Sequence, residues 1–191
     1  MPTITLDPKL AAALDLIAES EGTCSSPATL ADGYDIIVTG VDGPNNFTDY
    51  SHHPFSLGRP PILVRPARPA VYGPQDPDSI DPPAILAPGR HPLFSTASGR
   101  YQITRSTWEH LRETYKLGTF SPQAQDLACV HLLDECKATS LFAAGEVVQA
   151  IEAAADVWAS FPGNLCAAHS LRANSHCGTD LDRAYQLKPA V

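Results

Sequence analysis

The sequence has no long apolar run and little positive charge. No stretch approaches the roughly 18 consecutive apolar residues of a membrane-spanning helix, so we expect no membrane span. Residues 1–5 lack the basic and apolar regions of a secretory signal peptide. The 13 Lys and Arg residues are outnumbered by 21 Asp and Glu, giving a formal net charge of -8, which argues against nucleic acid as the main partner.

The five cysteines lack the C-x-x-C spacing of redox and zinc sites. Cys129 and Cys136 are seven residues apart, so they share a helix face and we expect buried thiols. Cys166 and Cys177 flank a polar loop and could form a disulfide in an oxidising compartment. No cysteine lies in an obvious His-paired motif, which argues against a catalytic thiol. We expect neither a metal site nor a cofactor.

The chain is long enough for a single domain over residues 1–191 with a substantial core. Hydrophobic residues make up 43%, so wholesale disorder is not expected. Residues 34–39 are β-branched and predict a strand, residues 47–50 are its candidate partner, and residues 40–46 have turn composition. The sequence thus predicts an α+β fold with a mainly helical body and a small sheet.

Four helices are predicted in the body. Asp7 and Pro8 are suited to begin the first, over residues 8–21. A capping box, Ser106-Thr107-Trp108-Glu109, begins the second. The remaining two are expected to run from Ser121-Pro122 to about residue 137 and from about 145 to 160, and a further short helix is possible near residues 181–187.

Glu21 is the most informative residue. It lies on the apolar stripe of the first helix, whose members follow at spacings of four, three and four, namely Leu10, Leu14, Ile17 and Glu21. Burial disfavours the charged form of a carboxyl and raises its pKa, as a general acid at neutral pH requires. Glu19 projects from the opposite side. The alternative reading is a Glu21 that caps a neighbouring loop or pairs with an Arg.

A Pro-rich stretch interrupts the chain. Eleven of the 18 prolines fall between Pro54 and Pro92, which excludes a regular helix or a central strand. We expect residues 56–97 to form an extended loop or flap beside the functional cleft. Residues 55–105 carry six Arg and three Asp, a local charge of +3 that leaves -11 for the remainder.

Polar and aromatic groups gather in three places: on either side of the Pro-rich stretch and around Trp158. A carboxyl with aromatic platforms and short polar donors is suited to a carbohydrate cleft, because sugars stack on rings and need directional hydrogen bonds. Taken singly, Trp158 lies on an apolar helix face and is expected in the core, Tyr101 could be ordinary core, and His53 could only shape a turn before Pro54.

Six short segments, taken together and in order, resemble the phage lambda lysozyme family, murein lytic transglycosylases that serve as endolysins. The resemblance covers about residues 10–54 and 97–163. The matching residues are Ser20-Glu21-Gly22-Thr23, Gly33-Tyr34-Asp35-Ile36-Ile37-Val38, Phe47-Thr48-Asp49-Tyr50-Ser51 with His53-Pro54, Gly99-Arg100-Tyr101-Gln102, Phe120-Ser121-Pro122 with Gln125-Asp126, and Trp158-Ala159-Ser160 with Pro162-Gly163.

The resemblance implies a lysozyme-like fold with Glu21 as the single catalytic acid. It implies cleavage of the β-1,4 bond between N-acetylmuramic acid and N-acetylglucosamine, with attack by the muramic C6 hydroxyl and a 1,6-anhydro product. Peptidoglycan strands are then the partner of a monomeric enzyme, made in the host cytoplasm and acting on the wall in the periplasm. The residues expected to bind substrate are Asp49, Tyr50, Ser51, His53, Arg100, Tyr101, Gln102 and Trp158.

The sequence departs from the family at three places. His52 stands where the family usually has an acidic residue, the Pro-rich stretch is longer than expected, and residues 164–191 diverge. Two alternatives remain open. One is a hydrolytic muramidase, with Asp49 as the second carboxylate. The other is a non-catalytic glycan-binding protein on the same fold.

Overall fold

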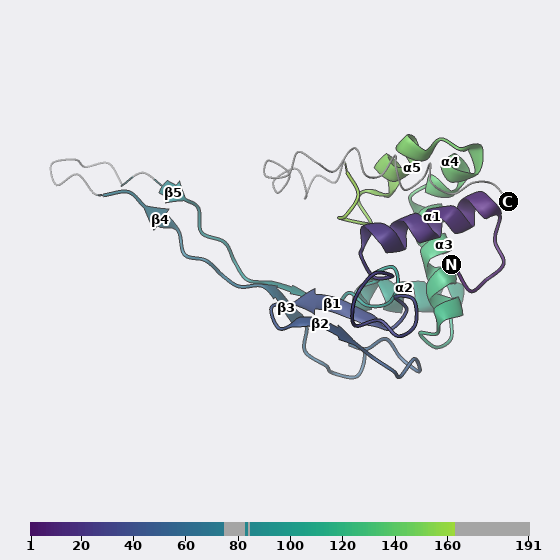
Figure 1. Cartoon of the computed structure of the whole chain (residues 1–191), viewed down its shortest axis with the longest axis horizontal. Coiled ribbons are helices and arrows are strands. Elements are labelled where there is room, and N and C mark those ends of the chain that lie inside the picture. Colours follow the sequence, from purple (N-terminus) through teal and green to yellow (C-terminus); the bar gives the residue numbers. More distant parts are fainter. Residues whose placement is uncertain (75–82, 84, 163–191) are drawn as a thin grey trace.

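The computed structural model describes residues 1–74, 83 and 85–162 (Figure 1). The candidate disulfide between Cys166 and Cys177, the possible short helix near 181–187 and the segment 164–191 lie outside these residues. The described part contains five helices, α1 (Pro8–Ser20), α2 (Arg105–Tyr115), α3 (Pro122–Glu135), α4 (Ala138–Ala144) and α5 (Val147–Ala154).

The first helix, α1, begins and ends as predicted. The Asp7 side chain accepts a hydrogen bond from the Lys9 amide at 2.9 Å, and Pro8 needs no amide partner in the first turn. The apolar face is buried, with Leu14 and Ile17 fully enclosed. Glu21 is the residue at which the helix ends, and Gly22 follows in the left-handed region with a φ of +68°.

The later helices differ from prediction at their boundaries. α2 is capped by Thr104, which accepts from the Thr107 amide, and not by Ser106. α3 begins at Pro122 after the Ser121 cap, as predicted. The helix expected over about 145–160 is present but shorter, because α5 ends at Ala154, and α4 was not predicted. Left-handed backbone at Lys137 and Gly145 separates these helices, a local feature that apolar periodicity does not reveal.

A short antiparallel hairpin follows α1 and replaces the predicted strand pairing. β1 (Ile36–Gly40) pairs with β2 (Gly43–Asn46), so the partner is the segment predicted as a turn and not residues 47–50. Gly43, with a φ of +96°, allows the chain to reverse in a tight turn. Pro44 has no amide hydrogen to donate to a neighbouring strand. It lies in β2, an outer strand of this two-stranded sheet, where a proline does not interrupt the hydrogen bonds of a central strand.

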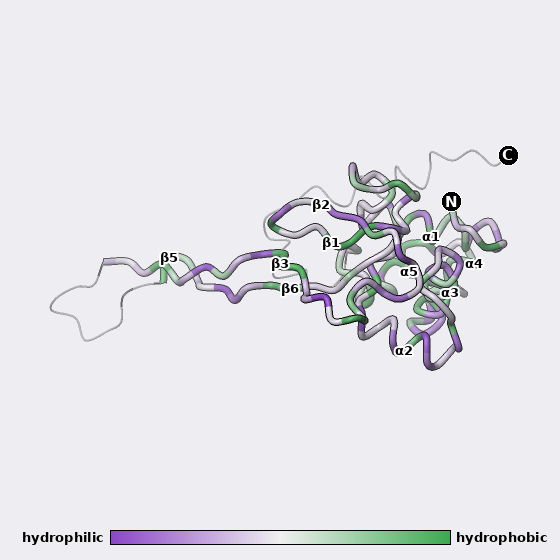
Figure 2. Tube along the Cα trace, turned by 90° about the horizontal axis from the view of Figure 1, so that it is seen from below, coloured by the Kyte–Doolittle hydropathy of each residue, from purple (hydrophilic) through white to green (hydrophobic). Residues whose placement is uncertain are grey.

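The described residues of the Pro-rich stretch form a β-arm, which we define as residues 56–74, 83 and 85–97. β3 (Ile62–Arg65) pairs with β6 (Leu93–Ser95) at its base, and β4 (Val71–Tyr72) pairs with β5 (Ile85–Ala87) farther out. The base adjoins the β1–β2 hairpin, because the amide of Val41, directly after β1, donates to the Leu63 carbonyl of β3 at 2.9 Å. The arm projects away from the body in both views (Figures 1 and 2), and its base packs beside β1.

The core lies among the five helices and the adjoining loops. Its largest enclosed side chains include Trp108, Tyr101, Phe120, Phe142 and Phe161. Buried Asp126 of α3 joins this core to the β1 region, because it accepts hydrogen bonds from the Tyr34 and Tyr101 hydroxyls at 2.7 and 2.6 Å. Over residues 1–74 and 85–162, no helix is long and apolar enough to cross a lipid bilayer.

Candidate active site

Glu21 lines a cleft of about 470 Å³ that lies between the end of α1 and the β1–β2 hairpin. The helix provides Glu21, the following loop provides the near wall, and the hairpin provides the far wall. The cleft is lined by Glu21, Gly22, Thr23, Ser25, Ser26, Pro27, Ile36, Val38, Thr39, Pro44 and Gln102. It is a mixed surface with apolar strand residues and several hydroxyl groups.

The surroundings of Glu21 suit a proton donor. Glu21 is the only titratable residue among the described residues that line the cleft. Burial of its side chain raises the pKa of Glu21, while a hydrogen bond from Ser160 opposes part of that rise. A carboxyl with a raised pKa retains its proton closer to neutral pH, which is the property general acid catalysis needs. Glu19, by contrast, is exposed, as expected.

Ser160 is a site residue that was not singled out from the sequence. Its hydroxyl donates to Glu21 Oε1 at 2.6 Å and lies 2.9 Å from the hydroxyl of Ser20. The only available signal was its place in the Trp158-Ala159-Ser160 segment, where the Trp attracted attention. Serines are too common for the residue type alone to have pointed to Glu21.

Gln102 reaches the cleft from the tight turn over residues 99–102. Its backbone has a φ of +50°, an uncommon conformation for a residue with a side chain and one that recurs at functional sites. The side-chain Nε2 donates to the Gly99 carbonyl at 3.0 Å. Gln102 is therefore the one predicted substrate residue that shares the cleft with Glu21 in the described part of the chain.

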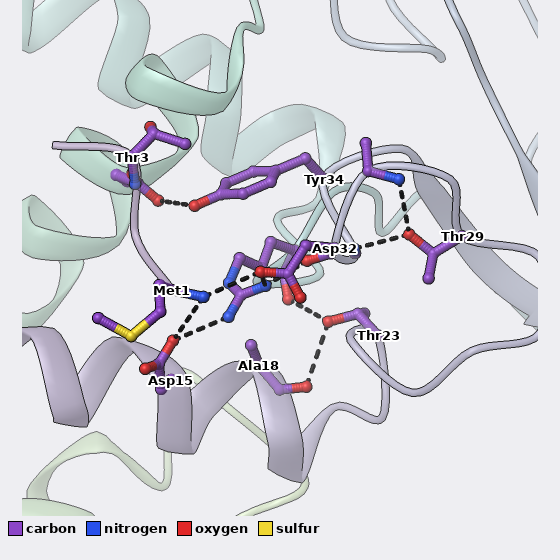
Figure 3. A network of polar contacts seen from close by, with 12 residues as sticks. Met1, Thr3, Asp15, Ala18, Thr23, Thr29, Asp32 and Tyr34 are labelled. Carbon is purple, nitrogen blue, oxygen red and sulfur yellow. Dashed lines mark hydrogen bonds and ion pairs between the residues drawn. The ribbon is translucent and has the colours of Figure 1, made fainter.

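Arg100 and Tyr101 are interior residues, which corrects their expected place on the groove surface. The Arg100 guanidinium pairs with Asp15 at 2.9 Å and Asp32 at 2.8 Å. Figure 3 shows these two carboxylates, which also pair with the Met1 amino group. The Tyr101 hydroxyl donates to Asp126, and burial raises the pKa of Tyr101. Both side chains hold the body together instead of facing the cleft.

His53 and Trp158 are likewise enclosed. The His53 Nδ1 accepts from the Phe55 amide at 3.3 Å, so Nε2 carries the hydrogen and donates to the Ile103 carbonyl at 3.0 Å. Burial lowers the pKa of His53, which favours this neutral form. The Trp158 indole donates to the Tyr101 carbonyl at 3.0 Å. Trp158 thus follows the core alternative, and neither residue lines the cleft.

Asp49, Tyr50 and Ser51 lie in the loop after β2, away from Glu21's cleft. Asp49 lines a second, smaller hollow of about 230 Å³. Its carboxylate accepts from the Ser51 amide at 2.8 Å, and hydrogen bonding to Ser51 lowers the pKa of Asp49. Tyr50 packs on Phe47 with ring centroids 5.1 Å apart. The expected grouping of all predicted residues in one groove is therefore not seen.

No group of three His, Cys, Asp or Glu side chains in the described segments is arranged to hold a metal ion. Cys24, Cys129 and Cys136 are free thiols. Cys129 is fully buried, as expected, and burial raises the pKa of its thiol, which makes it a poor nucleophile.

Comparison with known proteins identifies the family. A family model described as Endolysin matches residues 78–188, more than half of the chain. The endolysin of Escherichia phage P2 is 40% identical over 164 residues, covering 85% of each chain. The chain belongs to the endolysin family. The endolysin of Escherichia phage lambda is 32% identical over 151 residues, covering 78% of this chain and 75% of that protein.

Solved structures confirm the lysozyme-like α+β fold. Lysozyme from bacteriophage lambda matches with a TM-score of 0.65 at 27% identity, covering 95% of this chain and 92% of that one. The same lysozyme complexed with a chitohexasaccharide also gives 0.65, at 29% identity and with 96% and 97% covered. This endolysin is therefore a lysozyme-like enzyme of the phage type that acts on bacterial peptidoglycan.

Proposed function

We propose that this endolysin is a lytic transglycosylase that cleaves the β-1,4 bond between N-acetylmuramic acid and N-acetylglucosamine, with Glu21 as its single catalytic carboxyl. The supporting observation is that Glu21 is the only titratable residue among the described residues that line the cleft. Ordinary glycosidases use two carboxyls that flank the scissile bond. Asp49, the candidate second carboxylate, lines a different hollow.

One carboxyl is sufficient for this reaction. Protonated Glu21 donates its proton to the glycosidic oxygen as the bond to C1 breaks. The C6 hydroxyl of the muramic residue attacks C1, and its proton passes to the Glu21 carboxylate. A 1,6-anhydro ring forms, no water is consumed, and Glu21 returns to its acid form. A raised pKa favours the first step, because the acid must hold a proton at the pH of the wall.

The cleft is suited to a glycan strand. Its hydroxyl and amide groups, on Ser25, Ser26, Thr39 and Gln102, match the directional hydrogen bonds of sugars. The related lambda lysozyme was solved with a chitohexasaccharide, an oligosaccharide, in support of the same ligand class here. We propose a monomer that binds peptidoglycan and not nucleic acid, is made in the host cytoplasm, and acts in the periplasm.

Mass spectrometry of digested peptidoglycan tests the reaction. We expect muropeptides with 1,6-anhydro ends and no incorporation of oxygen from labelled water. Reducing ends that carry the label would instead establish a hydrolytic muramidase.

The Glu21→Gln variant tests the catalytic residue, because it keeps the shape of the side chain and removes the acid. We expect it to fold and to lose lysis by about 10²–10⁴-fold, the usual contribution of general acid catalysis. Glu19→Gln, on the exposed side of α1, is the matched control and should lyse walls normally. Substantial lysis by folded Glu21→Gln would overturn the assignment.

A further inference from the structure

Two serine hydroxyls connect Glu21 to the backbone of α1. Ser160 Oγ donates to Glu21 Oε1 at 2.6 Å, and Ser20 Oγ lies 2.9 Å from Ser160 Oγ. Ser20 Oγ also donates to the Ile17 carbonyl at 3.0 Å. That carbonyl already accepts the Glu21 amide at 2.9 Å, so it stays satisfied when the Ser20 hydrogen turns to Ser160. The chain Ser20 to Ser160 to Glu21 then runs in one donor direction.

This arrangement distinguishes the two carboxyl oxygens of Glu21. Oε1 is held by Ser160, whereas Oε2 has no hydrogen-bond partner among residues 1–74 and 85–162. A hydroxyl donor at Oε1 favours protonation at Oε2, because Oε1 then remains the carbonyl-type acceptor. When the proton leaves, the same Ser160 bond stabilises the carboxylate, and donation from Ser20 strengthens it through cooperative polarisation.

Ser160 is placed by contacts outside the catalytic helix. It lies in the turns after α5, where the Phe161 amide donates to the Trp158 carbonyl at 3.0 Å. Trp158 is in turn fixed by its indole bond to Tyr101. The enclosed Trp158 therefore holds the segment that brings the Ser160 hydroxyl to Glu21.

We propose that Ser160, supported by Ser20, is a positioning residue that holds Glu21 Oε1 in both protonation states and leaves Oε2 to exchange the proton with the glycan. The inference rests on the proposed role of Glu21 as the catalytic acid. Because the Ser160 bond is the same before and after proton transfer, the carboxyl needs no rearrangement between its acid step and its base step.

Charged side chains on the neighbouring elements do not account for the pKa of Glu21. The titratable residues nearest in sequence on the packed elements are Glu19 on α1, Cys24 in the following loop and Asp156 after α5, and Glu19 and Asp156 are exposed. Burial and Ser160 are the influences on the pKa of Glu21. Removal of the Ser160 hydroxyl should therefore raise that pKa, because the carboxylate loses its charge-assisted hydrogen bond.

The test compares Ser160→Ala, Ser160→Thr and Ser20→Ala with Ser140→Ala, a surface serine of α4 that serves as the matched control. Thermal unfolding first establishes that each variant is folded. We expect Ser160→Ala to reduce kcat about tenfold, the size of one hydrogen bond to a charged group, with KM little changed. Ser160→Thr keeps the hydroxyl and should restore activity, and Ser20→Ala should give a smaller loss.

Carbon NMR of the Glu21 carboxyl gives a readout that does not depend on activity. In Ser160→Ala the titration midpoint and the alkaline limb of the pH–rate profile should both move to higher pH, and in Ser140→Ala neither should move. Coincident titrations of the wild type and Ser160→Ala, or a Ser160→Thr variant as impaired as Ser160→Ala, would overturn the proposal. Failure of Glu21 as the acid would appear separately, as lysis by Glu21→Gln.

Discussion

At the residue scale, the properties of Glu21 come from its position and not from its residue type. Glu19 and Glu21 are two residues apart, yet one is exposed and the other lies at a partly buried cleft. Burial raises the pKa of Glu21, and no resolved charge on a neighbouring side chain offsets it. The cost of ionising this carboxyl in the folded state is the physical basis of the role as an acid that we propose for it.

Because ionising Glu21 in the folded protein costs free energy, we expect the Glu21→Gln variant to be more stable than the wild type at high pH. Because the pKa of Glu21 is raised in the folded state, folding favours its protonated form, and its ionisation removes stability as pH rises through the folded pKa. At pH values above the folded-state pKa of Glu21, the Glu21→Gln variant should therefore unfold at a higher Tm than the wild type. At pH below the unfolded-state pKa of the carboxyl the two should agree. Calorimetry across pH measures this, and a gain confined to low pH would contradict the sign.

Asp49 provides a second prediction at this scale. It is exposed, accepts from the Ser51 amide and lines a hollow separate from the cleft. We expect Asp49→Asn to retain lysis and to release anhydro products. Loss of all lysis in a folded Asp49→Asn variant, together with labelled reducing ends from the wild type, would favour a two-carboxyl hydrolase instead.

At the element scale, the turn over residues 99–102 is fixed against α3 by a glutamine clamp. The Gln125 Oε1 accepts from the Arg100 amide at 3.0 Å, and its Nε2 donates to the Tyr34 carbonyl at 3.0 Å. Gly99 has a φ of +77°, and a Cβ there would lie 2.1 Å from Gln125 Oε1. Only glycine permits this approach, and the turn in turn places Gln102 in the cleft.

Gly99→Ala should consequently destabilise the protein by about 2 kcal/mol or more, through left-handed strain and the clash with the clamp. Urea unfolding measures this loss. Gly118→Ala is the matched control, because a Cβ there meets nothing within 4 Å, and it should change stability by less than about 0.5 kcal/mol. Equal stabilities of the two variants would show that the clamp tolerates a side chain.

At the scale of the whole molecule, the β-arm is a separate extension of a folded body. It carries Arg65, Arg68 and Arg90, with large apolar side chains that stay exposed, among them Tyr72, Ile85 and Phe94. Figure 2 shows apolar segments at β3, β5 and β6 on this arm. We propose that its arginines attract the polyanionic wall during encounter, an effect that salt screens over about 8 Å at physiological strength.

Shortening the arm should separate its role from that of the body. A variant that joins Arg65 to Leu93 by a short turn should keep the wild-type Tm and raise KM on polymeric wall at low salt, with the difference fading at high salt. An Arg65, Arg68 and Arg90 to Gln variant keeps the length and should show the same salt dependence. Unfolding of the shortened variant would make the arm part of the core, and unchanged kinetics at low salt would make it a passive extension.

The sequence by itself determined the fold class, the first helix and the position of Glu21 at the end of its apolar face. These rest on local information: the cap at Asp7, the apolar spacing of α1 and ordered segments that resemble one family. Helix α4 and the partner of β1 could not be read in this way. They depend on left-handed residues such as Lys137 and Gly43, where backbone conformation overrides composition.

Only the tertiary structure decided which side chains accompany Glu21. Arg100, Tyr101, His53 and Trp158 have the chemistry of ligand-binding groups, but long-range partners such as Asp15, Asp126 and Ile103 enclose them in the body. Ser160 has unremarkable chemistry and contacts Glu21 only because the chain returns to it over a sequence separation of 139 residues. Sequence spacing fixes what lies on one helix face, whereas contacts between distant segments are set by how the elements pack.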